Sequence, residues 1–182
     1  EKKADLEFVQ KVKGTRALVC FIVQNVGDQL TPSDVTPEQF WGYTADDEAS
    51  LLTAIEKYAN AICDSIDAYG YDGFDYDYEP NYGHSGNISG NPTAEKKFVE
   101  TLAKRLGPSS GSDKMLVIDG EPQTIASELG KHFNYFIVQA YSCSGDANLD
   151  SRLASTISNF DGVLSAEEVA KKYIVTENFE NY

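Results

Sequence analysis

Hydrophobic residues along this chain follow two alternating patterns, short continuous apolar runs and longer amphipathic stretches. The runs combine β-branched and aromatic residues, which is typical of strands buried on both faces in a parallel sheet. They predict strands at Ala17–Val23, Met115–Asp119 and Tyr135–Tyr141, and a last strand from Lys172 to Thr176. The amphipathic stretches predict helices at Asp5–Val12, Asp47–Tyr69, Pro92–Leu106 and Leu149–Phe160, with another that opens at Ser165.

Glycine, proline and capping residues mark the ends of these elements. Gly70 and the pair Gly107-Pro108 stand at expected helix ends, and the segment 165–168 has a capping-box pattern. Two long segments, 24–46 and 81–91, predict loops. A loop as long as the first is usually functional or contains short structure of its own.

A further strand is predicted at Tyr71–Pro80, where acidic and aromatic residues alternate. Side chains alternate between the two faces of a strand, so Asp75, Asp77 and Glu79 share one face and three aromatic residues cover the other. Unpaired carboxylates resist burial, and a fold tolerates them mainly where it needs acids for chemistry or a metal. A solvated edge strand or a calcium loop is the alternative, but alternating bulky aromatic residues favour an extended strand.

Strands that alternate with helices predict an α/β protein with a parallel sheet. Five strands without a repeat or a low-complexity linker predict one domain over 1–182. They fit either an open doubly wound sheet or part of an eight-stranded barrel. The chain opens with a helix and ends just after a strand, so we expect it to be an excerpt of a longer alternation.

In a barrel, catalytic groups lie at the carboxyl ends of the strands. Glu79 occupies such an end and suits a general acid, whereas Asp75 and Asp77 lie progressively deeper in the same interior. Two close carboxylates in a dry site do not both ionise cheaply. Asp75 and Asp77 are therefore expected to share a proton as a coupled pair.

Composition narrows the class of partner. The 182 residues carry a net charge of −14, which argues against nucleic acid or an anionic membrane surface and is compatible with a neutral sugar. No apolar run has the ~20 residues of a membrane span, and no signal peptide is present, so we expect any targeting segment upstream. Cys20, Cys63 and Cys143 lack the spacing of a disulfide framework or zinc motif, and the first two are expected in the core.

The segment Asp72–Glu79, with sequence DGFDYDYE, resembles the DGxDxDxE signature of glycoside hydrolase family 18. That family includes chitinases and endo-β-N-acetylglucosaminidases on (β/α)8 TIM barrels, with the signature on the fourth strand. The resemblance implies that this single catalytic domain is a partial TIM barrel with about strands three to seven.

The resemblance also implies roles for the acids. Glu79 matches the general acid, Asp77 the acid that orients the 2-acetamido group of the substrate, and Asp75 the acid that tunes Asp77. Asp72 matches the mostly structural first acid and is kept among the candidate substrate-binding residues. The acetamido oxygen itself attacks the anomeric carbon, so an oxazolinium intermediate forms with no enzymic nucleophile, no metal and no cofactor.

Other candidate substrate-binding residues are Gln139 and Tyr141 on the sixth strand, Asn25 after the third and Glu177 after the seventh. Gln-x-Tyr in this place is closer to bacterial endoglycosidases than to chitinases. Asp119, Trp41 and Tyr82 stay open between site and structural roles. His84 and His132 are isolated from each other and are expected at the surface.

With these residues, the resemblance implies a retaining endo-β-N-acetylglucosaminidase that cuts the β-1,4 bond in the N,N′-diacetylchitobiose core of N-linked glycans. The alternatives are a chitinase and a catalytically silent glycan-binding protein on the same fold. The partner is an N-linked glycan or another N-acetylglucosamine-containing oligosaccharide, with no nucleic acid and no membrane span. We expect a monomer that acts extracellularly, in the periplasm or at the cell surface of a bacterium.

Overall fold

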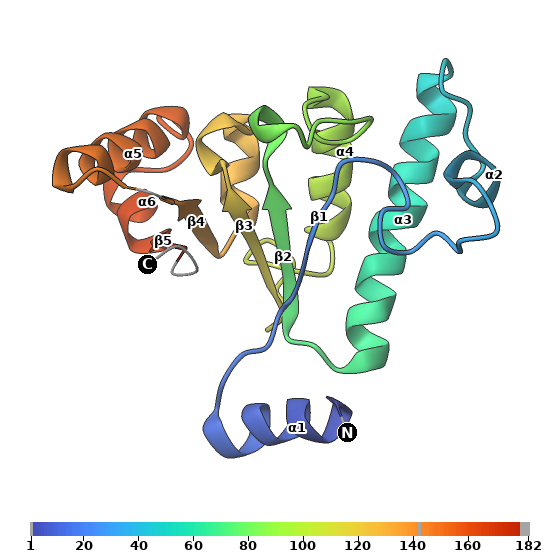
Figure 1. Ribbon diagram of the computed structural model, residues 1–182, viewed down its shortest axis with the longest axis horizontal. Helices are drawn as coiled ribbons and strands as arrows, with labels where there is room; N and C mark the ends of the chain where they lie inside the picture. Colours follow the sequence, from blue (N-terminus) through green and yellow to red (C-terminus); the bar gives the residue numbers. More distant parts are fainter. Residues whose placement is uncertain (1, 142, 179–182) are drawn as a thin grey trace.

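The computed structural model describes residues 2–141 and 143–178. In this part of the chain, five parallel strands form one sheet in the order in which they follow in sequence (Figure 1). They are β1 (Val19–Ile22), β2 (Gly73–Tyr78), β3 (Met115–Gly120), β4 (Tyr135–Gln139) and β5 (Tyr173–Thr176). The strand order of a doubly wound sheet reverses at a switch point, whereas this one does not. The sheet therefore has the topology of a (β/α)8 barrel, as predicted.

Helices connect the strands and lie outside the sheet. They are α1 (Lys2–Lys13), α2 (Pro37–Trp41), α3 (Glu48–Tyr69), α4 (Pro92–Leu102), α5 (Asp146–Asn159) and α6 (Ala166–Lys172). Short 3-10 helices are η1 (Pro80–Tyr82), η2 (Pro122–Thr124) and η3 (Ser127–His132). In Figure 1, α3 and α4 lie towards the β1 end of the sheet, α5 and α6 lie towards the β5 end, and α1 lies below the amino ends of the strands. No helix in the described residues is long and apolar enough to cross a bilayer.

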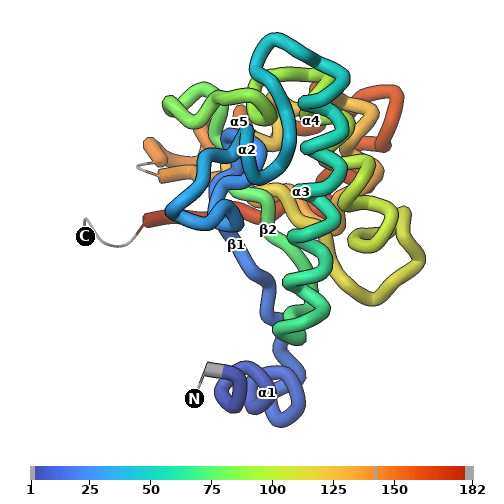
Figure 2. Tube along the Cα trace, turned by 90° about the vertical axis from the view of Figure 1, so that its right-hand side faces the viewer, coloured from blue at the N-terminus to red at the C-terminus, as the bar shows by residue number. Residues whose placement is uncertain are grey.

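An aromatic core joins β2 to the helices. Tyr76 lies edge-on to Phe98 of α4 with ring centroids 5.4 Å apart, and Phe98 stacks on Tyr58 of α3 at 5.9 Å. The side chains of all three are inaccessible to solvent. Each buried aromatic residue of this size contributes a few kcal/mol of stability, so this face of β2 is firmly attached to the helix layer (Figure 2).

The long segment between β1 and α3 contains structure of its own. Helix α2 has a capping box at Thr36 and ends at Gly42, which adopts a left-handed conformation. Trp41 is buried, donates its indole N–H to Thr31 Oγ1 at 2.9 Å and packs on Tyr58. Of the two roles left open for Trp41, the structure supports packing within its own loop.

Two sequence predictions about the core differ in outcome. Cys63 is buried on α3, as expected, but Cys20 is exposed. In the β1–β2 ladder Cys20 is paired with Asp75, which places it on the sheet face that carries the acids. The prediction of a core role for Cys20 was wrong because a buried-strand pattern does not reveal which face of the strand the helices cover.

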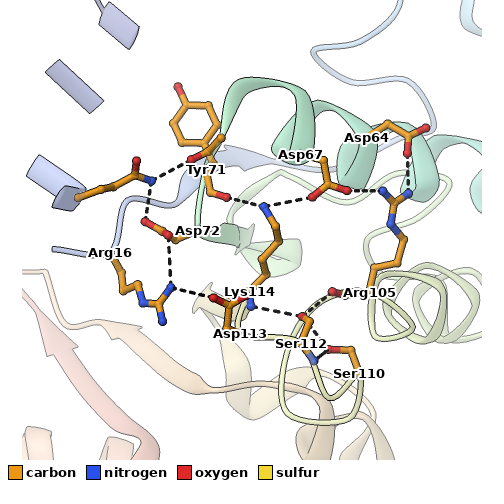
Figure 3. A network of polar contacts seen from close by, with 12 residues as sticks. Arg16, Asp64, Asp67, Tyr71, Asp72, Arg105, Ser110, Ser112, Asp113 and Lys114 are labelled. Carbon is orange, nitrogen blue, oxygen red and sulfur yellow. Dashed lines mark hydrogen bonds and ion pairs between the residues drawn. The ribbon is translucent and has the colours of Figure 1, made fainter. Parts of the chain in front are cut away.

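A polar network fastens the amino ends of the strands (Figure 3). One carboxylate oxygen of Asp72 accepts hydrogen bonds from the Ala17 backbone N–H at 2.8 Å and from the Gln10 amide at 2.9 Å. The other accepts from Arg16 at 3.3 Å. On the α3 side, Lys114 donates to the Tyr71 carbonyl and pairs with an acid of α3. These contacts hold α1, β1 and β2 together.

The same network corrects the assignment of Asp72 as a substrate-binding residue. Asp72 precedes β2, whereas Glu79 follows its last residue, and a strand rises about 3.3 Å per residue, so roughly 23 Å separate the two positions. Burial raises the pKa of Asp72, but the hydrogen bonds from Ala17, Gln10 and Arg16 outweigh it and leave the pKa below its usual value. Asp72 therefore stabilises the fold at the end of the sheet remote from Glu79.

We predict that Asp72→Ala lowers the free energy of unfolding of the full-length protein by about 1–3 kcal/mol, because the Ala17 N–H loses its acceptor. A lowered folded-state pKa contributes stability above the unfolded pKa, and this stability is lost as the pH falls through the folded value. The difference in the free energy of unfolding between wild type and Asp72→Ala should therefore become smaller in acid. Urea unfolding at several pH values measures this difference. Asp113→Ala is the control, since Asp113 is 82% exposed and lies 3.8 Å from the same arginine. An equal loss in both variants would contradict the assignment.

Candidate active site

Three carboxylates of β2 and the residue after it lie on the sheet face opposite the aromatic core. Asp75 and Asp77 are half-buried there, while Tyr76 and Tyr78 between and beyond them are buried against the helices. The alternation predicted for this strand is thus realised in the fold. Because β2 pairs with a strand on each side, the acids lie on an interior strand rather than at an edge of this sheet.

The strand is also held from behind. Tyr78 donates its hydroxyl to Glu95 Oε1 at 2.8 Å, and the Gly90 backbone N–H donates to the same oxygen at 2.5 Å. Glu95 is only 3% exposed, and its burial raises its pKa. A satisfied polar contact in a dry core fixes position strongly, so the carboxyl end of β2 has little freedom to move.

A further carboxylate joins the cluster from β3. Asp119 is paired with Asp77 in the β2–β3 ladder and faces the same side. Burial raises the pKa of Asp75 to about 7, with the charges of Asp119 and Asp77 adding to the shift. Burial raises the pKa of Asp77 to about 6, with help from Glu79 and Asp119. Asp75 is therefore partly protonated near neutral pH beside a mostly ionised Asp77, which is the condition for the shared proton predicted from the sequence.

Unsatisfied acceptors lie in the same cluster. Within the described residues, Asp75 Oδ1 and Asp119 Oδ1 are buried without a hydrogen-bond partner. A carboxyl oxygen in such surroundings favours protonation, because the ionised form loses hydration without compensation. In the same part of the chain, no three His, Cys, Asp or Glu residues are arranged to hold a metal ion.

Strand β4 adds polar groups to this side of the sheet. Gln139 directs its amide nitrogen at Asp77 Oδ1, 3.5 Å away, and also hydrogen-bonds Asp119, which partly offsets the rise that burial causes in the pKa of Asp119. Arg152 of α5 donates to the Gln139 carbonyl at 3.2 Å. Tyr141, two residues further, is 46% exposed. The structure thus places both residues of the Gln-x-Tyr pair beside the acids.

A cavity of about 300 Å³ opens next to Glu79. Its lining combines aromatic and polar side chains from the ends of β2, β3 and β4, from the segments that follow them and from α5. They are Glu79, Tyr82, Glu121, Gln123, Gln139, Tyr141 and Arg152, together with Gly120. Tyr82 is 70% exposed at its rim. A larger cavity of about 420 Å³ lies between β1 and α3, but its lining contains no carboxylate, so we place the chemistry at the smaller one.

His84 also belongs to this site, and its predicted surface role was wrong. Its ring Nε2 lies 3.6 Å from Glu79 Oε2, and its Nδ1 lies 2.6 Å from the amide nitrogen of Gln24. Gly83 adopts a left-handed conformation after η1 and turns the chain back towards Glu79. The segment between Glu79 and His84 carries no periodic signal, so only the position of Gly83 hinted at this return.

The remaining sequence candidates connect loops. Asn25 Oδ1 accepts a hydrogen bond from the Asn87 backbone N–H at 2.9 Å and so fastens the segment after β2 to the one after β1. The structure brings the neighbouring Gln24, rather than Asn25, to the acid cluster through His84. Glu177 follows β5 and accepts a hydrogen bond from the Cys143 N–H at 3.4 Å, which links it to the segment after β4.

Solved structures with the same fold include three that are informative. A selenomethionine variant of BT1044, with one glutamate replaced by glutamine, is 38% identical, with a TM-score of 0.82, and the match covers 98% of this chain and 53% of that one. A double mutant of an endo-β-N-acetylglucosaminidase from Cordyceps militaris, in complex with fucosyl-N-acetylglucosamine-Asn, is 19% identical, with a TM-score of 0.59 and coverages of 99% and 52%. The chitinase domain of the spore coat protein CotE from Clostridium difficile is 15% identical, with a TM-score of 0.54 and coverages of 97% and 53%.

The chain spans about half the length of these three proteins. No curated protein matches it. The two structures with low identity show the fold alone. A family match, however, extends over residues 1–182 and carries the description glycoside hydrolase family 18, BT1044-like. The resemblance inferred from the segment 72–79 is thereby confirmed, and the chain belongs to glycoside hydrolase family 18.

Proposed function

We propose that this protein is a retaining endo-β-N-acetylglucosaminidase that hydrolyses the β-1,4 bond in the N,N′-diacetylchitobiose core of N-linked glycans. The observation that carries the proposal is the row of carboxylates from Asp75 to Glu79 on one face of β2, beside a cavity lined by Gln139 and Tyr141. Since such glycans are found on exported glycoproteins, we also propose that the enzyme acts outside the cytoplasm of a bacterium.

In this proposal Glu79 protonates the glycosidic oxygen as a general acid and later takes a proton from the attacking water. The 2-acetamido oxygen of the substrate attacks the anomeric carbon as the glycosidic bond breaks, which gives an oxazolinium ion. Asp77 holds the acetamido N–H and stabilises the positive charge that develops. Its contact with Gln139 is consistent with this task, since the amide fixes the direction of the carboxylate.

Asp75 and Asp119 supply the electrostatic setting. Both lie close enough to Asp77 to raise its pKa or to have their own pKa raised by it, so a fraction of the cluster still carries a proton near neutral pH. As positive charge develops on the substrate, a nearby Asp77 carboxylate becomes more favourable and Asp75 can keep the shared proton. The proton thus moves within the pair rather than to solvent.

Two other functions compete with this one. A chitinase would use the same acids, and the chitinase domain of CotE shares the fold. A silent glycan-binding protein would keep the cavity without turnover, but such proteins usually lack one of the acids, and here Asp75, Asp77 and Glu79 are all present. The Gln-x-Tyr pair on β4 favours the endoglycosidase over the chitinase.

A substrate panel separates the three functions. We expect the full-length protein to release glycan from glycoproteins with high-mannose, hybrid or complex glycans, leaving one N-acetylglucosamine on asparagine, and to leave chitin oligomers uncut. Mass spectrometry of the protein identifies the remaining sugar, and NMR of the released glycan should show the β-anomer first. Cleavage of chitin oligomers alone would establish the chitinase, and binding to glycans without turnover would establish the silent protein.

The acids can be tested separately by isosteric substitution. Glu79→Gln should reduce kcat by about 10²-fold or more with binding retained, because the proton donor is lost. Asp77→Asn should lose about as much, since a neutral amide stabilises the oxazolinium cation poorly. Steady-state kinetics and glycan-binding isotherms measure both effects. Normal hydrolysis by Asp77→Asn would exclude substrate assistance, and an unchanged rate in Glu79→Gln would exclude its role as the acid.

Asp119→Asn tests whether the charge of Asp119 raises the pKa values of its neighbours. The negative charge of Asp119 raises the pKa values of Asp75 and Asp77, so its removal should lower both. The second proton would then bind to the pair only in stronger acid. The acid limb of the kcat/KM profile, which reports groups of the free enzyme, should therefore move to lower pH. Asp113→Asn, at the far end of the sheet, should leave the profile in place. A limb that moves to higher pH would contradict this electrostatic assignment.

A further inference from the structure

Loop 84–91 is firmly attached to the segment that follows β1. Backbone N–H groups of Ile88 and Ser89 both donate to the Gln24 carbonyl, at 2.9 and 3.2 Å. Asn87 donates its N–H to Asn25 Oδ1 and accepts at its own Oδ1 from the Val26 N–H, each at 2.9 Å. Ile88 and Ser89 are fully buried. His84, at the start of this loop, is therefore carried by a fixed piece of backbone.

The partners of the His84 ring determine where its proton points. The Gln24 amide nitrogen lies 2.6 Å from Nδ1, and an amide nitrogen only donates, so Nδ1 is the acceptor. The proton of the neutral ring is then on Nε2. This nitrogen faces Glu79 Oε2 at 3.6 Å, which is within the range of an ion pair but longer than a hydrogen bond. Catalytic contacts of this kind commonly shorten when substrate binds.

Both ends of the contact are partly shielded from water. The side chains of Glu79 and His84 are 16% and 34% exposed. A cavity of about 280 Å³, lined by Gln24, Asp28 and His84 among others, lies on the β1 side. The 300 Å³ cavity that includes Glu79 lies towards β4. The two cavities thus flank the contact, so a bound oligosaccharide that extends from one to the other would cover it and strengthen its electrostatics.

We propose that His84 is a positioning residue for Glu79, holding Oε2 through Nε2–H so that the catalytic proton is carried by Oε1. This inference rests on the proposed function. In the first step the Oε1–H bond of Glu79 breaks, the proton passes to the leaving oxygen, and the electron pair of the glycosidic bond stays on that oxygen. In the second step Oε1 takes a proton from the water that opens the oxazolinium ion. His84 keeps Oε2 occupied throughout.

Other charged or titratable groups surround the pair. They are Asp77 on β2, Asp119 and Glu121 at the end of β3, Asp28 after β1, Tyr141 after β4 and Arg152 on α5. Arg152 directs its guanidinium to the Gln139 carbonyl and to Asn148, and Asp28 accepts two backbone N–H groups.

Kinetics of three variants test the proposal on active protein. His84→Ala should lower kcat at least tenfold with KM changed less than about threefold, since the acid is misdirected while binding is retained. His84→Gln places an uncharged N–H near the position of Nε2 and should recover most of this loss. His132→Gln is the control, because His132 pairs with Ser109 away from the acid cluster. Equal kinetics in His84→Ala and wild type would overturn the proposal.

An NMR measurement that needs no turnover separates this inference from the proposed function. The ring nitrogen signals of His84, assigned by their disappearance in His84→Gln, should have different chemical shifts in Glu79→Gln and in wild type, because Nε2 loses its carboxylate neighbour. The ring signals of His132 should keep their chemical shifts. Unchanged His84 chemical shifts would overturn the contact even in an active enzyme. Changed His84 chemical shifts in a protein without hydrolase activity would retain the contact and reject the proposed function.

Discussion

The structure depends on the alternation of side chains along β2. Phe74, Tyr76 and Tyr78 pack into the aromatic core beneath α3 and α4, and their burial determines which way the strand faces. Because side chains alternate between the two faces of a strand, Asp75 and Asp77 must then lie on the opposite face. A slip of one residue would bury the acids in the core, at a cost of several kcal/mol for each charge. The hydrophobic core thus selects the register that gathers the carboxylates.

Placing the carboxylates close together costs electrostatic free energy, and the same repulsion changes their pKa values in a way that suits the proposed chemistry. Burial and mutual repulsion raise the pKa values of Asp75 and Asp77 towards neutrality, so a proton is retained where a fully ionised cluster would repel its own members. Tyr78 and Glu95 hold the strand from behind, which prevents the cluster from relaxing by moving apart. A rigid strand that keeps like charges together provides proton-sharing groups beside the cavity at Glu79.

Several features were predictable from local pattern alone. The strand and helix order, the all-parallel sheet and the acid face of β2 all follow from periods of two and 3.6 residues, and the segment 72–79 identified the family. The errors have a common origin, because both depend on contacts between distant segments that a local pattern does not show. Cys20 has the pattern of a core residue but lies beside Asp75, and Asp72 belongs to the acidic run but contacts Gln10, Ala17 and Arg16 at the other end of the sheet.

By itself, the sequence determined what depends on neighbours along the chain: the secondary structure, the spacing of Asp75, Asp77 and Glu79, and the direction in which their side chains alternate. Only the tertiary structure decided what depends on contacts between distant segments. It brought Asp119 and Gln139 to Asp77 across the parallel ladders, and it returned His84 to Glu79 through a loop fastened to Gln24 and Asn25. Such loops have no period, and their path is set by hydrogen bonds to residues about 60 positions away, which no local pattern encodes.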